Sequence, residues 1–244
     1  MKFLVKTDVG KAREINEDSY YVPQNEDDLK LFIVADGMGG YNGGEIASSL
    51  AIKSARNYIE TNFIGTPKDR ESMQKLIKSS MQYANMVVYE KSKESDELKG
   101  MGTTLVLALV TPEYILFGNI GDSSGFVMKN NHLHKVTHDH TLVNLLVSAG
   151  ELTEEEARNH PRKNILMNAL GINDPIDIDI FDCSMEIDSI LLCSDGLTTM
   201  LLDEQIEKTL LEENLTIEEK VERLINKANN RGGKDNISVA YLVK

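Results

Sequence analysis

The sequence predicts an α+β fold, a layered sandwich of two mostly antiparallel β-sheets flanked by helices on both outer faces. Three observations indicate this class. Strand-like and helix-like segments occur in blocks, successive strands are joined by connections of hairpin length, and each long helical segment carries one apolar face. The 244 residues, 41% hydrophobic and 27% charged, suit one large domain, which we expect to span residues 1–244.

The first block contains three strands and two helices. Composition rich in β-formers between turn residues predicts strands at 3–9, 18–22 and 31–35. Apolar residues at helical spacing then predict a helix from about 44 to 59 and a second from about 68 to 91.

The second block returns to strands, and a less regular segment interrupts it. Strands are predicted at 103–110, 114–120 and 125–129. Between 138 and 171, a capping box at Thr153 and Glu156 and the helix breaker Pro161 predict an irregular flap at about 141–170. Later patterns predict strands at 178–182, 189–193 and 237–243, and helices at 203–211 and 216–229.

Four aspartates stand at predicted strand ends. Two apolar runs stop at Asp-Gly pairs, and two further acids follow or precede strands; the four are Asp36, Asp122, Asp195 and Asp235. If these strands lie side by side, the acids converge and repel one another unless protons or hard cations such as magnesium or manganese lie between them. This pattern points to metal-assisted chemistry on a phosphate.

A single Asp-Gly pair is more often simply a turn, because glycine accepts positive φ and aspartate bonds its own backbone. Four such acids together with Glu17 and Asp18 favour the metal site over that interpretation. Arg13 precedes this acidic pair, and its planar guanidinium matches phosphate bidentately, so beside a carboxylate cluster it is a candidate anion clamp.

Charge and composition exclude other classes. The net charge of −13 disfavours nonspecific nucleic-acid binding and anionic membranes. Cys183 and Cys193 define no disulfide framework, and neither a signal peptide nor a membrane span is apparent, so we expect a cytoplasmic enzyme. No role is assigned to the aspartates of the predicted strand near 178, which are Asp174, Asp177, Asp179 and Asp182.

Six sequence blocks together resemble the metal-dependent serine/threonine protein phosphatases of type 2C, and their order and spacing match bacterial members over nearly the whole chain. The blocks are Arg13-Glu-Ile-Asn-Glu17-Asp18, Asp36-Gly-Met-Gly-Gly40 with Gly44-Glu45-Ile-Ala-Ser48, Gly102-Thr-Thr104, Gly118-Asn-Ile-Gly-Asp122-Ser123, Asp195-Gly196 and Gly233-Lys-Asp235-Asn236. Each block alone is weak evidence, whereas their joint occurrence is specific.

The resemblance implies a role for each matching residue. The implied metal ligands are Glu17 (through water), Asp36 (bridging), the Gly37 carbonyl, Asp122 (an extra, weaker third ion), Asp195 and Asp235. Asp18 and Asn236 would orient metal-bound waters, and Arg13 would bind the substrate phosphate. Glycines at 37, 39, 40, 43 and 44 would let the backbone pass close to the metals.

The implied reaction is hydrolysis of phosphoserine and phosphothreonine in proteins at two manganese or magnesium ions, with a possible third. Paired ions lower the pKa of a shared water, which attacks phosphorus without a covalent enzyme intermediate. The expected partners are phosphorylated proteins, including a Ser/Thr kinase that the enzyme opposes, and the expected oligomeric state is a monomer.

Three positions depart from the family pattern. Met38 replaces a histidine proposed as general acid in animal relatives, so a metal-bound water or a flap residue such as His160 would protonate the leaving group. Ser124 stands where the family often has arginine. Four histidines at 132, 134, 138 and 140 could suggest zinc or copper, but their spacing favours a solvated hairpin and loop.

Two alternative functions remain open from the sequence. One is a metal-dependent hydrolase of small phosphate esters or nucleotides, and the other is a non-catalytic scaffold with the same fold. The scaffold is disfavoured because no matching ligand is missing, and the absence of a phosphate-binding loop of the G-x-x-x-x-G-K-[ST] type disfavours a nucleotide-driven motor or kinase.

Overall fold

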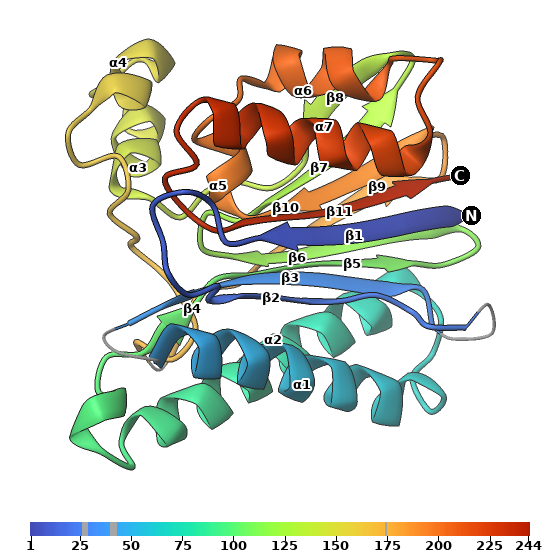
Figure 1. Ribbon diagram of the computed structural model, residues 1–244. Helices are drawn as coiled ribbons and strands as arrows, with labels where there is room; N and C mark the ends of the chain where they lie inside the picture. Colours follow the sequence, from blue (N-terminus) through green and yellow to red (C-terminus); the bar gives the residue numbers. More distant parts are fainter. Residues whose placement is uncertain (26–28, 40–42, 174) are drawn as a thin grey trace.

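The computed structural model describes residues 1–25, 29–39, 43–173 and 175–244. In these residues two antiparallel sheets stack face to face, with helices on both outer faces, as expected (Figure 1). The strands are β1 (Lys2–Asp8), β2 (Asp18–Tyr21), β3 (Leu31–Met38), β4 (Gly102–Thr103), β5 (Leu105–Val110), β6 (Tyr114–Ile120), β7 (Ser124–Lys129), β8 (His132–Lys135), β9 (Asp179–Ser184), β10 (Ser189–Cys193) and β11 (Ile237–Val243). The predicted fold class is confirmed.

The first sheet has the order β1-β11-β10-β7-β8. The last strand, β11, lies between β1 and β10 and pairs antiparallel with both. Its seven residues are almost all buried, as expected for a strand covered on both faces.

The second sheet has the order β2-β3-β5-β6-β9, with the short β4 paired to the end of β3. Strand β2 is therefore an edge strand. Because β3 and β6 are both antiparallel to β5, they run in the same direction and end at the same edge of the sandwich. Strand β2 begins at that edge, since Asp18 pairs with Asp36.

Helices cover the two outer faces, and the two sheets divide the apolar interior into three layers. They are α1 (Gly43–Phe63), α2 (Arg70–Ser92), α3 (Leu142–Ser148), α4 (Glu154–Asn159), α5 (Asp195–Thr198), α6 (Asp203–Leu210) and α7 (Ile217–Asn230), with a 3₁₀ turn at Asp96–Leu98. Figure 1 shows α1 and α2 on the β2 sheet and α6 and α7 on the β11 sheet. One core lies under each helix pair, and a third, which includes Phe32 and Phe117, lies between the sheets.

The differences from the predicted elements are local. Strand 103–110 is divided at Thr104, α1 extends to Phe63, and α5 is a single helical turn that has no apolar periodicity to reveal it. The predicted flap contains α3 and α4, and the Thr153–Glu156 capping box is present. No helix among the described residues has the length and apolarity needed to cross a membrane.

Candidate functional site

Asp18 and Asp36 are opposite one another on neighbouring strands. Asp18 is the first residue of β2, and Asp36 lies near the end of β3 as its register partner. Burial raises the pKa of the Asp36 carboxyl well above its ordinary value, and repulsion from Asp18 and Asp195 adds to this rise. It is therefore unfavourable for all carboxylates of the site to be ionised at once without a balancing positive charge.

Two threonines fix the backbone of Asp36. The Asp36 N–H donates to the Thr104 hydroxyl oxygen at 2.9 Å, and the Thr104 N–H donates to the Asp36 carbonyl at 2.9 Å. The Thr103 hydroxyl also donates to that carbonyl, at 2.8 Å. Thr104 lies between β4 and β5, so these bonds hold the chain to Asp36 at the point where the predicted strand is divided.

Ser194 connects the two sheets at Asp18. The Ser194 hydroxyl donates to Asp18 Oδ2 at 2.7 Å and accepts from the Ser238 N–H at 2.9 Å. Burial raises the pKa of Asp18 to about 7, although hydrogen bonds from Ser238 and Ser194 oppose the rise. The second oxygen of this carboxyl, Oδ1, is buried and has no hydrogen-bond partner.

Asp195 is the first residue of α5, directly after β10. Burial raises its pKa to about 6, and repulsion from Asp235 contributes, while hydrogen bonding with the Asp36 carboxyl opposes the rise. The Oδ1 atom of Asp195 is also buried without a hydrogen-bond partner. Asp36 and Asp195 thus influence each other's pKa although Asp36 lies on a strand of one sheet and Asp195 follows a strand of the other.

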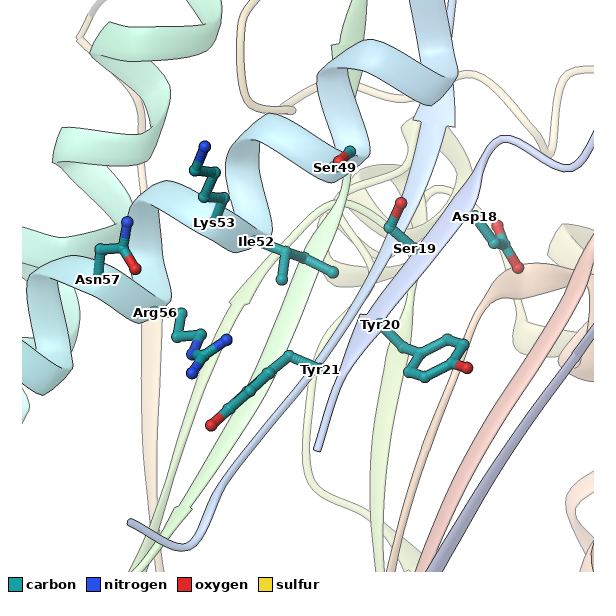
Figure 2. Close-up of a pocket in the computed structure, with 9 residues that line it drawn as sticks. All are labelled: Asp18, Ser19, Tyr20, Tyr21, Ser49, Ile52, Lys53, Arg56 and Asn57. Carbon is teal, nitrogen blue, oxygen red and sulfur yellow. The ribbon is translucent and has the colours of Figure 1, made fainter. Parts of the chain in front are cut away.

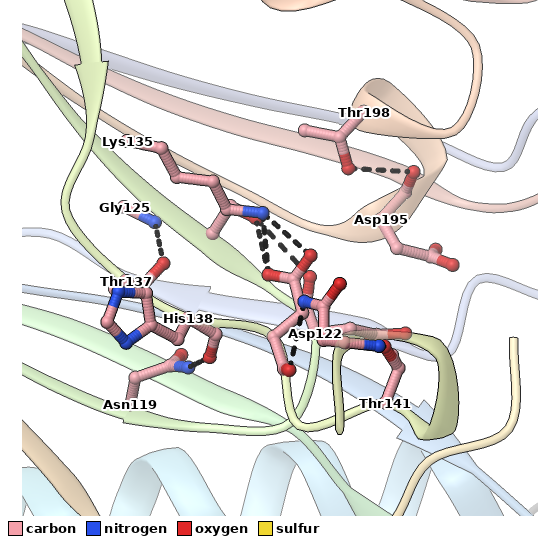
Figure 3. A network of polar contacts seen from close by, with 12 residues as sticks. Asn119, Asp122, Gly125, Lys135, Thr137, His138, Thr141, Asp195 and Thr198 are labelled. Atoms are coloured by element: carbon pink, nitrogen blue, oxygen red, sulfur yellow. Dashed lines mark hydrogen bonds and ion pairs between the residues drawn. The ribbon is translucent and has the colours of Figure 1, made fainter. Parts of the chain in front are cut away.

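Asp122 lies in the connection between β6 and β7, on the side of Asp195 (Figure 3). Burial raises its pKa well above the ordinary value, and repulsion from Asp195 and Asp139 adds to this. The positive charge of Lys135 partly opposes the shift in the pKa of Asp122, and the same ammonium forms an ion pair with Asp139 at 2.6 Å. Asp122 therefore belongs to the same carboxylate group.

Asp235 differs from the other aspartates because it has a cationic partner. Arg13 Nη2 donates to Asp235 Oδ2 at 2.8 Å, and both side chains are partly exposed. This hydrogen bond raises the pKa of Arg13. The anion clamp expected from the sequence thus lies at the mouth of the site, held by one of the expected ligands.

Glu17 and two glycines form a close-packed cradle. A Cβ atom on Gly37 would lie 2.1 Å from the Gly44 carbonyl oxygen, and one on Gly44 would lie 2.3 Å from Glu17 Oε1. Only glycine permits this approach. Burial raises the pKa of Glu17, whose Oε1 atom has no hydrogen-bond partner. Gly40, which the sequence grouped with these glycines, lies outside the described residues.

Asn236 binds protein backbone with all of its side-chain polar atoms. Its Nδ2 donates to the carbonyls of Val9 at 2.9 Å and Ile15 at 3.0 Å, and its Oδ1 accepts from the Glu17 N–H at 2.8 Å. The sequence suggested that Asn236 orients metal-bound waters. These contacts also fix the loop that carries Arg13 and Glu17, and the role toward metal-bound waters stays a prediction.

The donor set fits hard divalent cations. Three carboxylate oxygens, on Glu17, Asp18 and Asp195, are buried without a partner, and such orphaned acceptors are costly unless protons or cations satisfy them. Among the described residues, no three His, Cys, Asp or Glu side chains are already set around one point so that they could hold an ion.

Sequence reasoning missed the residues that position the acids. Thr104 lies within a recognised block and Ser194 directly before one, but serine and threonine have many structural uses and no diagnostic spacing, so neither was assigned a role. His140 was also missed: its Nε2 lies 3.1 Å from Asp179 Oδ2, and its Nδ1 accepts from the Gly121 N–H at 3.4 Å, next to Asp122. Asp179, to which the sequence analysis assigned no role, therefore has a partner beside this site.

Comparison with known proteins gives consistent matches over the full chain. Residues 10–238 match the model of the protein phosphatase 2C family. The serine/threonine phosphatase stp of Listeria monocytogenes serotype 4b (strain F2365) is 39% identical over 236 residues, which cover 96% of this chain and 92% of that protein.

Solved structures show the same similarity. The serine/threonine phosphatase Stp1 from Staphylococcus aureus has a TM-score of 0.92 and 32% identity, with 100% of this chain and 94% of that chain covered. The catalytic domain of the serine/threonine protein phosphatase PstP in complex with two manganese ions has a TM-score of 0.82 and 30% identity, with 99% and 97% covered.

Proposed function

The chain belongs to the protein phosphatase 2C family and is a metal-dependent serine/threonine protein phosphatase, and from this premise we propose which of its residues carry the reaction. The observation that supports the assignment best is the group of buried carboxylates with unpartnered oxygens at one edge of the sandwich. The proposed metal ligands are Glu17, Asp36, Gly37 through its carbonyl, Asp122, Asp195 and Asp235.

The ligands divide by position within this group. Asp36 is central, because repulsion from Asp18, Asp195 and Asp122 raises the pKa of its carboxyl. We propose that this carboxylate would bridge two ions. The pKa of Asp122 is raised chiefly by burial and then by repulsion from Asp195 and Asp139. We therefore place Asp122 at the Asp195 side of the group, where a third ion would bind. Oxygen donors of this kind suit manganese or magnesium.

Bound divalent ions supply Lewis-acid charge that lowers the pKa of water and balances the phosphate oxygens. The protein supplies orientation and further charge. Ser194 holds Asp18 so that its free Oδ1 faces the site and can accept a proton or a water hydrogen bond. Arg13 presents a guanidinium fork at the mouth, where it can bind two oxygens of the substrate phosphate.

Arg13 and a bound metal would both use Asp235. The guanidinium donates to Asp235 Oδ2 at 2.8 Å, so if Asp235 held an ion through this oxygen, Arg13 would be free to bind the substrate phosphate. Metal loading would in this way prepare the substrate clamp. The sequence-based role of Arg13 is kept, with this exchange of partners added to it.

The leaving alcohol must be protonated, and Met38 cannot do this because its thioether carries no proton. His160 ends α4, and its Nδ1 accepts from the Arg162 N–H at 3.1 Å. Within the described part of the chain, no recorded contact joins His160 to the carboxylates. We therefore favour a water molecule over this flap residue as the proton donor.

The biological substrates are proposed to be phosphorylated proteins, including a Ser/Thr kinase that this monomeric phosphatase would oppose. The cytoplasmic location expected from the sequence stays a prediction, as does a separate flap at about 141–170. Small phosphate esters are the alternative substrates, and relative turnover of phosphopeptides and nucleotides separates the two.

The assignment is tested by titrating chelator-treated protein with Mn²⁺ while following both binding by calorimetry and turnover of a phosphopeptide. Asp36→Ala and Asp195→Ala should each lose at least one bound ion and abolish turnover. Asp182→Ala, at an acid paired with Arg70 on the outer sheet edge, is the control and should change neither. Full Mn²⁺ binding with unchanged kcat in Asp36→Ala would refute the assignment.

A further inference from the structure

A pocket of about 410 Å³ lies between strand β2 and helix α1. Its walls include Asp18, Ser19 and Tyr20 from β2, and Lys53, Arg56 and Asn57 from α1 (Figure 2). Asp18 lines the pocket and also belongs to the carboxylate group, although its carboxyl bonds to Ser194 of the other sheet, so the pocket borders the proposed metal centre at the start of β2. A chain segment next to a phosphorylated residue bound at the metals could therefore extend into it.

One wall of the pocket is the open edge of a sheet. Strand β2 pairs only with β3 among the described strands. The Asp36 N–H and carbonyl bond to Thr104, on the side away from β2, whereas the Gly37 N–H donates to the Glu17 carbonyl. In an antiparallel pair these directions alternate, so Ser19 and Tyr21 bond to β3 and the Tyr20 N–H and carbonyl face the pocket.

Tyr20 is available for a further strand. Its side chain is 43% exposed, and outside the β2–β3 pair the described residues provide no hydrogen bond to its backbone. Sheet edges of this kind bind extended peptides by adding a strand, with side-chain pockets supplying the specificity.

The opposite wall is basic, in a chain whose net charge is −13. Arg56 is already engaged: its Nε donates to Glu60 Oε1 at 2.8 Å, and its guanidinium lies 4.2 Å from the centre of the Tyr21 ring. Lys53 is exposed and has no hydrogen bond or ion pair with any described residue. It is thus an unpaired cation among the residues that line the pocket.

We propose that this pocket is a substrate subsite, in which the chain flanking the phosphorylated residue lies extended beside β2 with an acidic side chain near Lys53. The proposal rests on the metal centre assigned above. Charge complementarity and the shared residue Asp18 select this occupant. Lys53 then acts on specificity, through KM for flanked substrates.

The charge arm of the test compares two phosphothreonine peptides that differ only in having glutamate or glutamine at the flanking positions. The wild-type enzyme should show a lower KM for the glutamate peptide, and Lys53→Glu should raise that KM by about threefold to tenfold with little change for the glutamine peptide. Lys78→Glu, at an exposed lysine of α2 that makes the same change in net charge, is the matched control.

The backbone arm uses the same peptide methylated at one flanking amide nitrogen at a time. Strand addition predicts that methylation raises KM at alternate positions, because every second N–H faces β2. The subsite is refuted if Lys53→Glu alters both peptides equally or neither, or if no methylated position matters.

These outcomes are distinct from failure of the metal centre. Turnover of p-nitrophenyl phosphate, which has no flanking chain, is measured alongside for each variant as a check on the centre. A normal Mn²⁺ requirement for this small substrate with no effect of Lys53→Glu on either peptide overturns the subsite alone. A turnover that needs no metal overturns the centre first.

Discussion

The Ser194 hydroxyl, directly after β10 of one sheet, donates a hydrogen bond to Asp18 of the other sheet at 2.7 Å and so links the two halves of the sandwich at the site. Ser194 follows β10, whereas Asp18 begins β2. The same hydroxyl oxygen accepts from Ser238 on β11. The position of Asp18 thus depends on both sheets being correctly stacked.

Ser194→Ala should lower both the Mn²⁺ affinity and kcat by about tenfold or more, because hydrogen-bond partners of metal-site carboxylates keep them oriented. Its free energy of unfolding should fall by about 1–3 kcal/mol, since a buried donor and acceptor lose their partner. Ser80→Ala removes another buried hydroxyl, bonded to the Ile77 carbonyl, and should lower only the stability. Calorimetric Mn²⁺ titration and thermal unfolding measure the two effects; equal Mn²⁺ affinities in both variants would contradict the prediction.

Thr104→Val should lower kcat, because the Asp36 N–H loses the hydroxyl oxygen that accepts from it at 2.9 Å. Valine preserves the shape of the side chain but leaves this donor unsatisfied, at a cost of about 1–3 kcal/mol. Thr104→Ser keeps the hydroxyl and should restore most of the turnover. Steady-state kinetics on one phosphopeptide decides this, and equal rates in the two variants would show that the hydroxyl is unimportant.

Arg13→Ala should change two constants in opposite senses. KM for a phosphopeptide should rise about tenfold, because a charged hydrogen-bond donor to phosphate is lost. The Kd for Mn²⁺ should fall about threefold, because Asp235 loses its competing cation. Arg223→Ala, at an exposed arginine paired with Glu212, is the control and should alter neither constant. A weaker Mn²⁺ affinity in Arg13→Ala would refute the proposed competition.

Metal-free protein should lose stability as the pH rises from about 4 to 8. The folded-state pKa values of Asp18 and Asp195 are raised to about 7 and about 6, so the folded chain holds protons that the unfolded chain has released. The free energy of unfolding therefore falls with pH across this window, and Tm should drop on the order of 5 °C.

Thermal unfolding after chelation at several pH values measures this slope. Adding Mn²⁺ should restore stability, and more at pH 8 than at pH 5, because protons compete with the ion for the same oxygens. Asp18→Asn removes one of the titrating groups and should flatten the slope. A Tm that climbs with pH in the chelated protein would contradict the raised pKa values.

Much of the fold followed from periodicity. The long helices and the buried strands carry strong apolar patterns, and the positions of Asp36, Asp195 and Asp235 at strand ends were visible because glycine or apolar runs mark those ends. α5 was not predicted, since four residues are too short for a helical repeat.

The supporting contacts could not be predicted in the same way. Thr104 and Ser194 act through bonds to residues far away in sequence, and a hydroxyl has no pattern that names its partner. Asn236 was expected to orient metal-bound waters, which stays a prediction, and no sequence pattern indicated the bonds of its side-chain amide to three backbone groups. Arg13 was expected to bind the substrate phosphate, and its bond to Asp235 likewise had no sequence signal.

The central place of β11 bears on how the protein is made. This strand follows both of its partners in the sequence, yet it lies between β1 and β10, and it begins two residues after Asp235. Contacts of such long sequence separation form slowly and late. We therefore expect a nascent chain in which β11 has not yet been synthesised to lack the paired sheet that positions Asp235, so that phosphatase activity arises only after this strand has been made.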